Sequence, residues 1–268
     1  MQTRGRSIGG HLRDWRQRRR LSQLALACEA DISARHLSFI ETGRSSPSRE
    51  MVLRLAERLE VPLRERNLLL VAAGYAPVYP ERPLQDPALD AARKIIDTVL
   101  AGHEPYPALA IDRHWTLVAA NKALSPLLTG IDPALLQPPI NALRVGLHPA
   151  GLAPRIANFA EWRAHLLARL RRQIDLTGDP VLARLLHEFS EYPSANSGKF
   201  DRLFATREYD GIVVPLRLAV GAEVLSLISM TTVFGTPVDI TLSEIAIEAF
   251  LPADTTAAEA LRRLASAA

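Results

Sequence analysis

The sequence predicts two domains: an all-α N-terminal domain, followed by an α+β domain built on a five-stranded antiparallel sheet with helices. In residues 1–75, apolar side chains recur three or four positions apart, which is typical of helices. In residues 91–268, short alternating segments flank a helical block, which indicates strands on either side of it. Between them, residues 76–90 hold four prolines within eleven positions, which predicts an extended linker.

The length and composition agree with two globular domains. The chain has 268 residues, of which 48% are hydrophobic and 23% charged. No apolar run approaches the roughly 20 residues of a membrane span, and the N-terminus lacks the apolar core of a signal peptide. We therefore expect a cytoplasmic protein with no membrane partner. Cys28 is the single cysteine, which predicts a small buried thiol, with a redox switch as the alternative.

The first domain is expected to hold five helices. They are predicted over 8–19, from Gln23, from Ala34, over 49–59 and over 63–73. The second and third of them have the spacing of a helix–turn–helix. Small Ala27 sits where the two helices must approach closely, Asp31 falls at the turn, and Ser33 is placed to cap the next helix. Leu37 and Ile40 then lie three apart on one face of that helix. Such a second helix is suited to reading a DNA major groove.

This region resembles the XRE family, the phage-repressor type of helix–turn–helix, over about residues 5 to 73. The residues that carry the resemblance are Leu21, Gln23, Leu26, Ala27, Ile40, Glu41, Gly43 and Pro47. One departure is Asp31, because the turn position often holds Gly; Asp tolerates the left-handed conformation better than most residues. The resemblance implies double-stranded DNA as the partner. Because a single head buries too little surface for specific binding, we also expect a homodimer that reads two half-sites. The alternative is a purely structural helical domain.

The resemblance also implies which residues contact DNA. The predicted DNA-binding residues are Gln23, Ser33, Ala34, Arg35, His36, Ser38, Phe39 and Arg44. Gln23 and Arg44 match positions that contact the DNA backbone and set register. Arg35 is expected to read a guanine with two hydrogen bonds, with a phosphate contact as the alternative. His36 is expected to contact the backbone or solvent.

Positive charge is concentrated in the first 80 residues. They contain 14 Arg and no Lys against 8 acidic residues, a net charge of +6. Because the whole chain carries +3, the remainder carries −3. This segregation favours DNA binding by the N-terminal part. The run from Arg16 to Arg20 contributes most of it, although it also suits a solvated helix end.

The second domain opens with a helix over 89–100 and two short strands over 108–111 and 116–120, which flank a polar turn. Asn121 then lies in position to cap a helix over 122–128. This strand–turn–strand–Asn–helix order resembles the opening of a PAS domain. The remaining predicted elements are helices over 154–174, 180–191 and 257–265 and strands over 211–220, 223–233 and 240–251. Pro154 is expected to open the long helix, and Asp254 or Thr255 the last one.

The segment from Asn141 to Ile174 resembles the ligand-binding domain of MmyB-like regulators, which join an XRE-type head to a PAS-like sensor. The resemblance implies a small apolar ligand, with a fatty acid as the leading candidate. The predicted ligand-binding residues are Leu117, Asn121, Leu124, Leu128, Arg144, His148, Arg155, Asn158, Phe159, Trp162, Leu166 and Arg169, and Leu216 and Leu227 are further wall candidates. A carboxylate head needs a fork of donors, for which arginine is the best side chain. The alternative is that the apolar residues are plain core and that Arg155 and Asn158 only brace a loop.

We expect a sequence-specific, ligand-responsive transcription regulator. The sequence contains no catalytic motif and no His/Cys pattern at metal spacing, so neither an enzyme nor a metal site is expected. No cofactor is expected beyond the ligand itself. Two alternatives stay open for the second domain: a haem or flavin in its pocket, or a dimerisation module without any ligand.

Overall fold

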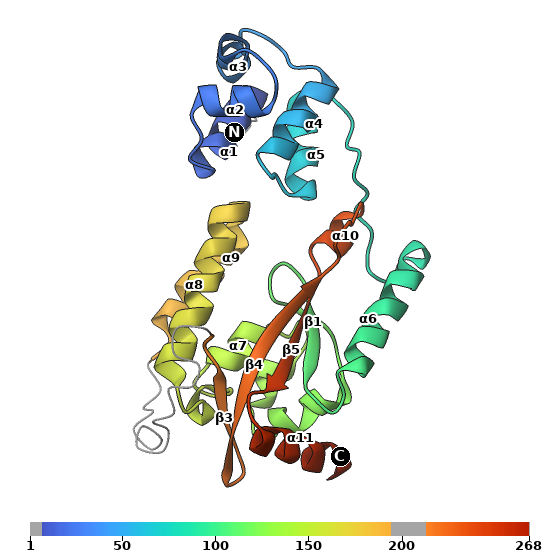
Figure 1. Ribbon diagram of the computed structural model, residues 1–268, viewed down its shortest axis with the longest axis vertical. Helices are drawn as coiled ribbons and strands as arrows, with labels where there is room; N and C mark the ends of the chain where they lie inside the picture. Colours follow the sequence, from blue (N-terminus) through green and yellow to red (C-terminus); the bar gives the residue numbers. More distant parts are fainter. Residues whose placement is uncertain (1–6, 194–212, 268) are drawn as a thin grey trace. The chain divides into compact units, whose positions relative to one another are not determined.

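The computed structural model describes residues 7–193 and 213–267 (Figure 1). The chain divides into two compact units. The first runs to Arg82 and includes 175–177 and 236–243, and the second contains the rest. A helical N-terminal region followed by a domain with a five-stranded antiparallel sheet confirms the predicted fold class.

The N-terminal unit holds the five expected helices. They are α1 (Ile8–Arg18), α2 (Gln23–Glu29), α3 (Ala34–Glu41), α4 (Arg49–Arg58) and α5 (Leu63–Ala72). Their apolar faces meet in one core, in which Leu12, Leu26, Leu37 and Leu55 are completely buried. The helical spacing in the sequence therefore identified the core correctly.

Serine side chains begin the first four helices. Ser7, Ser22, Ser33 and Ser48 each accept a hydrogen bond from the backbone N–H three residues later. Each bond satisfies one of the N–H groups that a helix start leaves free. Asp31, at the turn between α2 and α3, has a φ of 53°, so Asp adopts the left-handed conformation that the motif requires.

Two glycines shape the surroundings of α3. A Cβ on Gly9 in α1 would lie 2.3 Å from the carbonyl oxygen of Ile40, so only Gly allows α1 to approach α3 so closely. Gly43 has a φ of 73° and follows the end of α3. On α2, Cys28 is exposed, so the prediction of a buried thiol is wrong.

The first part of the predicted linker is bonded to α5. The Asn67 side chain accepts hydrogen bonds from the N–H groups of Val78 and Tyr79 and donates one to the Tyr79 carbonyl. Arg64 forms an ion pair with Glu81 at 2.6 Å. The later part contains a 3-10 turn, η1 (Pro87–Leu89), which leads into α6 (Asp90–Gly102). Residues 76–90 are therefore not one uniform extended segment.

The C-terminal unit is built on one antiparallel sheet. Its strands are β1 (Ala108–Ile111), β2 (Leu117–Ala120), β3 (Leu216–Val220), β4 (Glu223–Val233) and β5 (Ala246–Pro252), in the order β2-β1-β5-β4-β3. β3 is shorter than the predicted strand over 211–220, of which Gly211 and Ile212 lie outside the described residues. The strand predicted over 240–251 begins only at Ala246. The Asp239 side chain accepts the N–H of Thr241 and starts a short helix there, α10 (Ile240–Ser243).

The helical elements lie between and after the strands. They are η2 (Lys122–Leu128), η3 (Pro133–Leu136), α7 (Ala142–Leu147), η4 (Ala153–Arg155), α8 (Phe159–Thr177), α9 (Pro180–Glu191) and α11 (Thr255–Ala267). Pro154 lies within η4, and α8 begins only at Phe159, so the predicted helix start is wrong. The Asn158 side chain bonds the carbonyl of Pro215 and the N–H of Arg217, which holds the start of α8 beside β3. Asp254 caps α11 by accepting the N–H of Ala257.

Asn121 does not cap η2 with its side chain, contrary to the prediction. Its Oδ1 accepts the N–H of Ala108, and its Nδ2 donates to the carbonyls of Leu100 and Tyr106. The residue is buried and ties the end of α6 to β1. Tertiary partners therefore outcompeted the local cap.

Replacing Asn121 by Ala is expected to lower the free energy of unfolding by about 2 kcal/mol, because three buried or part-buried backbone groups lose a hydrogen bond. Urea denaturation followed by circular dichroism measures the change. Lys122→Ala, at the exposed neighbouring position, is the control and should change stability little. Equal stabilities of the two variants would contradict the bracing role.

Candidate functional site

The helix α3 buries one face and leaves another available. Leu37 and Ile40 are fully buried in the core of the N-terminal unit, whereas Arg35 is exposed. His36, Ser38 and Phe39 are partly exposed. Ala34 also packs partly against the core, so it offers less surface than expected.

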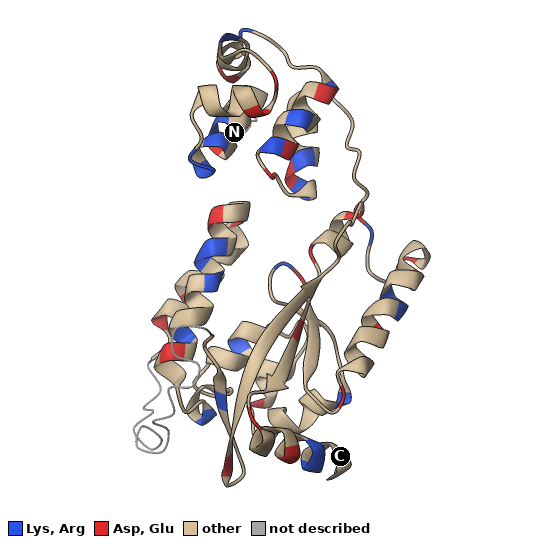
Figure 2. Ribbon diagram, viewed as in Figure 1, with Lys and Arg blue, Asp and Glu red and all other residues tan. Residues whose placement is uncertain are grey.

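Phe39 brings two of the predicted DNA-binding arginines together. The guanidinium carbon of Arg35 lies 5.3 Å from the centre of the Phe39 ring, and that of Arg44 lies 5.9 Å from it. Contacts of this kind hold a cation against a ring while its N–H groups stay available. No hydrogen bond joins either guanidinium to another residue within the described ranges. Figure 2 shows the basic residues of the N-terminal unit along its helices and loops.

Glu41, at the end of α3, connects three helices. Its carboxylate accepts hydrogen bonds from Arg16 of α1 at 2.7 and 2.9 Å and from the Gln23 amide of α2 at 2.7 Å. The side chain is completely buried. Burial opposes its ionisation, but the bonds from Arg16 and Gln23 and the charges of Arg16 and Arg13 outweigh it, so the pKa of Glu41 is lowered.

These contacts give several predicted DNA-facing groups a structural role. Gln23 holds Glu41, and its predicted phosphate contact stays a prediction. Within the basic run, Arg16 pairs with Glu41, and Arg19 donates to the carbonyls of Leu59 at 2.8 Å and Glu60 at 3.0 Å. Part of this run therefore stabilises the unit and is not a free cationic surface.

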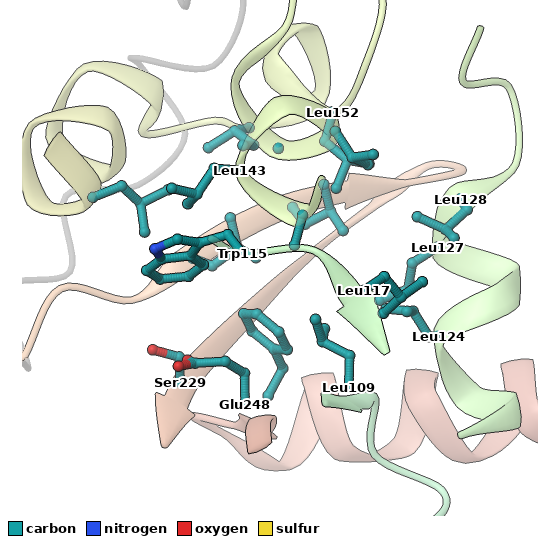
Figure 3. A pocket seen from close by; sticks show the side chains of 18 of the residues that line it. Leu109, Trp115, Leu117, Leu124, Leu127, Leu128, Leu143, Leu152, Ser229 and Glu248 are labelled. Carbon is teal, nitrogen blue, oxygen red and sulfur yellow. The ribbon is translucent and has the colours of Figure 1, made fainter. Parts of the chain in front are cut away.

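The C-terminal unit encloses an apolar pocket of about 130 Å³ between the sheet and the helical segments that precede α9 (Figure 3). Of the predicted ligand-binding residues, it is lined by Leu117, Leu124, Leu128, Trp162, Leu166 and Arg169, and Leu216 and Leu227 line it too. Figure 3 shows Leu124, Leu127 and Leu128 at one side of the pocket and Glu248 at the other. The structure thus brings the predicted apolar walls together.

Half of the predicted ligand-binding residues do not line this pocket. They are Asn121, Arg144, His148, Arg155, Asn158 and Phe159. Arg144 donates two hydrogen bonds, both 2.7 Å long, to Glu188 of α9. The bond from Arg144 lowers the pKa of Glu188 although burial opposes it, so this pair is ionised and internal. Arg144 is therefore not a free anchor for a ligand carboxylate.

The other predicted ligand-binding residues that do not line the pocket also contact residues of the protein itself. Arg155 donates to the carbonyls of Ala219, Leu127 and Thr129. The His148 ring accepts the N–H of Ala150. Phe159 is fully buried in the core. The bracing alternative considered for Arg155 and Asn158 therefore describes their contacts in the structure.

A cluster of polar side chains lies at the pocket wall. Arg169 of α8 pairs through both terminal nitrogens with Glu248 of β5, which is buried. Thr231 of β4 donates to the same carboxylate at 2.9 Å. The guanidinium carbon of Arg169 lies 4.6 Å from the centre of the Trp115 ring, and the Trp115 indole donates to Gln173 at 2.8 Å. Trp115, Ser229 and Glu248 lie together in Figure 3.

Sequence reasoning missed Trp115, Ser229 and Glu248 as lining residues. A signal for Glu248 exists, because it is the one charged residue in the apolar run 246–251. A charge in a strand that is otherwise apolar implies a buried partner. The run did not reveal which arginine that partner would be.

The described residues contain no group of three or more His, Cys, Asp or Glu side chains arranged to hold a metal ion. None of their helices combines the length and the apolar character needed to traverse a bilayer.

Comparison with known families supports both halves of the chain. Residues 7–69 match the model of a helix-turn-helix domain, and residues 92–264 match that of the MmyB-like transcription regulator ligand binding domain. Comparison with curated proteins found no match. Both matching families describe parts of transcription regulators, and neither describes an enzyme. The second match covers well over half of the chain, which therefore belongs to the MmyB-like transcription regulators, with a DNA-binding helix-turn-helix domain and a ligand-binding domain.

Proposed function

We propose that this regulator binds an inverted-repeat operator as a homodimer and changes its DNA affinity when a small apolar molecule enters the C-terminal pocket. A single helix–turn–helix head buries little DNA surface, so two heads spaced by about one helical turn are needed for specific binding. The exposed Arg35 and Arg44, both held against Phe39, support the DNA contact. Because the protein acts on DNA, we propose a cytoplasmic location for it.

The observation that carries the ligand proposal is the pocket itself. Its described lining is apolar except for Arg169, Ser229 and Glu248. An engineered apolar cavity of about 150 Å³ binds benzene, so a pocket of similar size suits a ring or a short chain. The fatty acid implied by the family fits with its tail against the leucines, and a longer chain requires the pocket to widen. The strand order β2-β1-β5-β4-β3 supports the PAS-like resemblance.

We propose no cofactor. Haem and flavin are far larger than a pocket of about 130 Å³. The purified protein should therefore show no absorbance in the visible range, and a coloured protein would favour the cofactor alternative.

Filling the pocket is expected to abolish ligand binding. Gly146 lines the pocket, and a Cβ built on it meets no atom within 4 Å, so Gly146→Leu adds a bulky side chain at the pocket wall without a clash at its Cβ. Octanoate should stabilise the wild-type protein in a thermal shift experiment and have no effect on Gly146→Leu. Operator binding without ligand should be unchanged, as measured by fluorescence anisotropy.

Gly102→Leu is the matched control. Gly102 is also helical and also has open space around its Cβ position, but it is exposed and does not line the pocket. It should keep the octanoate response. If octanoate stabilised Gly146→Leu as strongly as the wild type, the pocket would not be the ligand site. If it failed to stabilise the wild type, the domain would not take this ligand class.

A further inference from the structure

The pocket contains one positive and one negative side chain, and they neutralise each other. Among its described lining residues, Arg169 and Glu248 are the charged ones. Both carboxylate oxygens of Glu248 accept hydrogen bonds, one from Arg169 and Thr231 and the other from Arg169 alone. Glu248 is 3% exposed, so solvent gives its charge little support. Among the described lining residues, Arg169 supplies the positive charge that balances it.

Among the described residues, Arg169 is the cation whose side chain is bonded to Glu248. Across the sheet, Glu248 faces Leu109 of β1 and Thr231 of β4, neither of which titrates. On α8, His165 stacks on Trp162, 5.6 Å away. Burial and the charges of Arg169 and Arg172 lower the pKa of His165, and the charges of Glu248 and Glu161 oppose this shift without reversing it, so a second positive charge is disfavoured there.

We infer that this pocket accepts ligands only in an electrically neutral form: a neutral molecule enters directly, and a carboxylic acid enters together with one proton. The inference rests on the proposed ligand-binding function. An acid in the pocket places two carboxyl groups beside one guanidinium, and one positive charge balances one carboxylate. The second carboxyl group holds a proton drawn from solvent.

The number of protons taken up on binding distinguishes carboxylic acids from neutral alcohols of the same chain length. Octanoate is ionised in neutral solution, so its binding requires the uptake of about one proton, and its affinity falls about tenfold for each pH unit above neutrality. 1-Octanol carries no charge, so its binding takes up no proton, and its affinity is independent of pH over the same range. Hydrophobic transfer of the two chains is nearly the same.

The experiment is titration calorimetry of the full-length protein with octanoate and 1-octanol between about pH 7 and pH 8.5. Measurements in phosphate and in Tris, which have different heats of ionisation, report the number of protons taken up. We expect about one proton for octanoate and none for 1-octanol. Octanoate binding without proton uptake, at constant affinity across this range, would overturn the inference.

Glu248→Gln tests the residue responsible. The amide keeps the size of the side chain and leaves the Arg169 guanidinium free to pair with a ligand carboxylate. Octanoate should then bind without a proton and, at about pH 8.5, at least about tenfold more tightly than to the wild type. 1-Octanol should bind both proteins equally, which checks that the pocket is intact.

Glu188→Gln is the matched control, since it removes a carboxylate from another arginine pair of the same unit that does not line the pocket. It should behave as the wild type does. Unchanged proton uptake in Glu248→Gln would overturn the inference and leave the proposed function standing. Failure of both probes to bind the folded wild type would overturn both. If Glu248→Gln fails to fold, the wild-type proton count decides alone.

Discussion

Replacing Glu41 by Ala is expected to lower the free energy of unfolding of the N-terminal unit by about 3 to 5 kcal/mol. The substitution leaves the Arg16 guanidinium, whose side chain is 11% exposed, without its carboxylate partner. It also removes the acceptor of the Gln23 amide. Because these contacts join α1, α2 and α3, the recognition helix loses its support, and operator binding should be lost with it.

Urea denaturation monitored by fluorescence measures this loss, since Trp15 lies in the core of the N-terminal unit. Glu57→Ala is the control, because Glu57 is an exposed acid on α4. It should change stability by less than about 0.5 kcal/mol. A loss of similar size in both variants would show that the buried carboxylate is not what holds the three helices.

The same carboxylate predicts how stability responds to acid. The pKa of Glu41 lies below its ordinary value of 4.5, so the folded unit binds a proton there less readily than the unfolded chain does. The stabilisation is therefore complete above the ordinary value and is lost as the pH falls through the lowered one. Glu41→Gln should be less stable than the wild type at neutral pH, and the gap should narrow in acid. A gap that stays constant would contradict an ionised Glu41.

The helical unit was predictable from sequence because its signals are local. Ser33 accepts a bond from a residue three positions away. Asp31 and Gly43 adopt left-handed conformations, which the short polar side chain of Asp tolerates and the missing Cβ of Gly permits. The errors in the second unit have tertiary causes. Asn121 bonds Leu100, which is 21 positions earlier, in preference to the helix that follows it. Such partners leave no mark at short range in the sequence.

The pocket likewise has one part that was predictable from sequence and one that was not. Its apolar walls were predictable, because residues such as Leu124 and Leu166 face the interior whether they serve as core or as lining. Its polar end was not, because an arginine reveals its role only through its partner. Arg144 meets Glu188, which is 44 positions away, and Arg169 meets Glu248, which is 79 positions away. Nothing near either arginine distinguishes an internal pair from a ligand anchor.

Replacing Arg35 by Ala is expected to remove sequence discrimination at one base pair of each half-site, worth about 1–3 kcal/mol. Arg35 is exposed near the N-terminus of α3, and the N-terminal residues of a recognition helix are the ones that contact base edges. The two terminal nitrogens of its guanidinium can donate two hydrogen bonds to a guanine. The measurement compares the affinities of the wild type and Arg35→Ala for operator variants substituted at each position, at fixed salt. If their relative affinities were unchanged, Arg35 would not read a base.

Arg44→Ala is the matched comparison, since both arginines contact the same Phe39 ring. A residue that contacts phosphate weakens binding to all sequences alike and reduces the slope of log affinity against log salt by about 1. If the arginines acted only by packing on the Phe39 ring, both variants would change DNA affinity equally, and neither the salt slope nor the sequence preference would distinguish them. We therefore expect Arg35→Ala to change the preference among operator sequences and Arg44→Ala to lower the affinity for all sequences alike. If both variants changed the preference for operator sequences in the same way, the assignment of separate roles would be wrong. The Phe39 ring, which positions both arginines, would then set the sequence specificity.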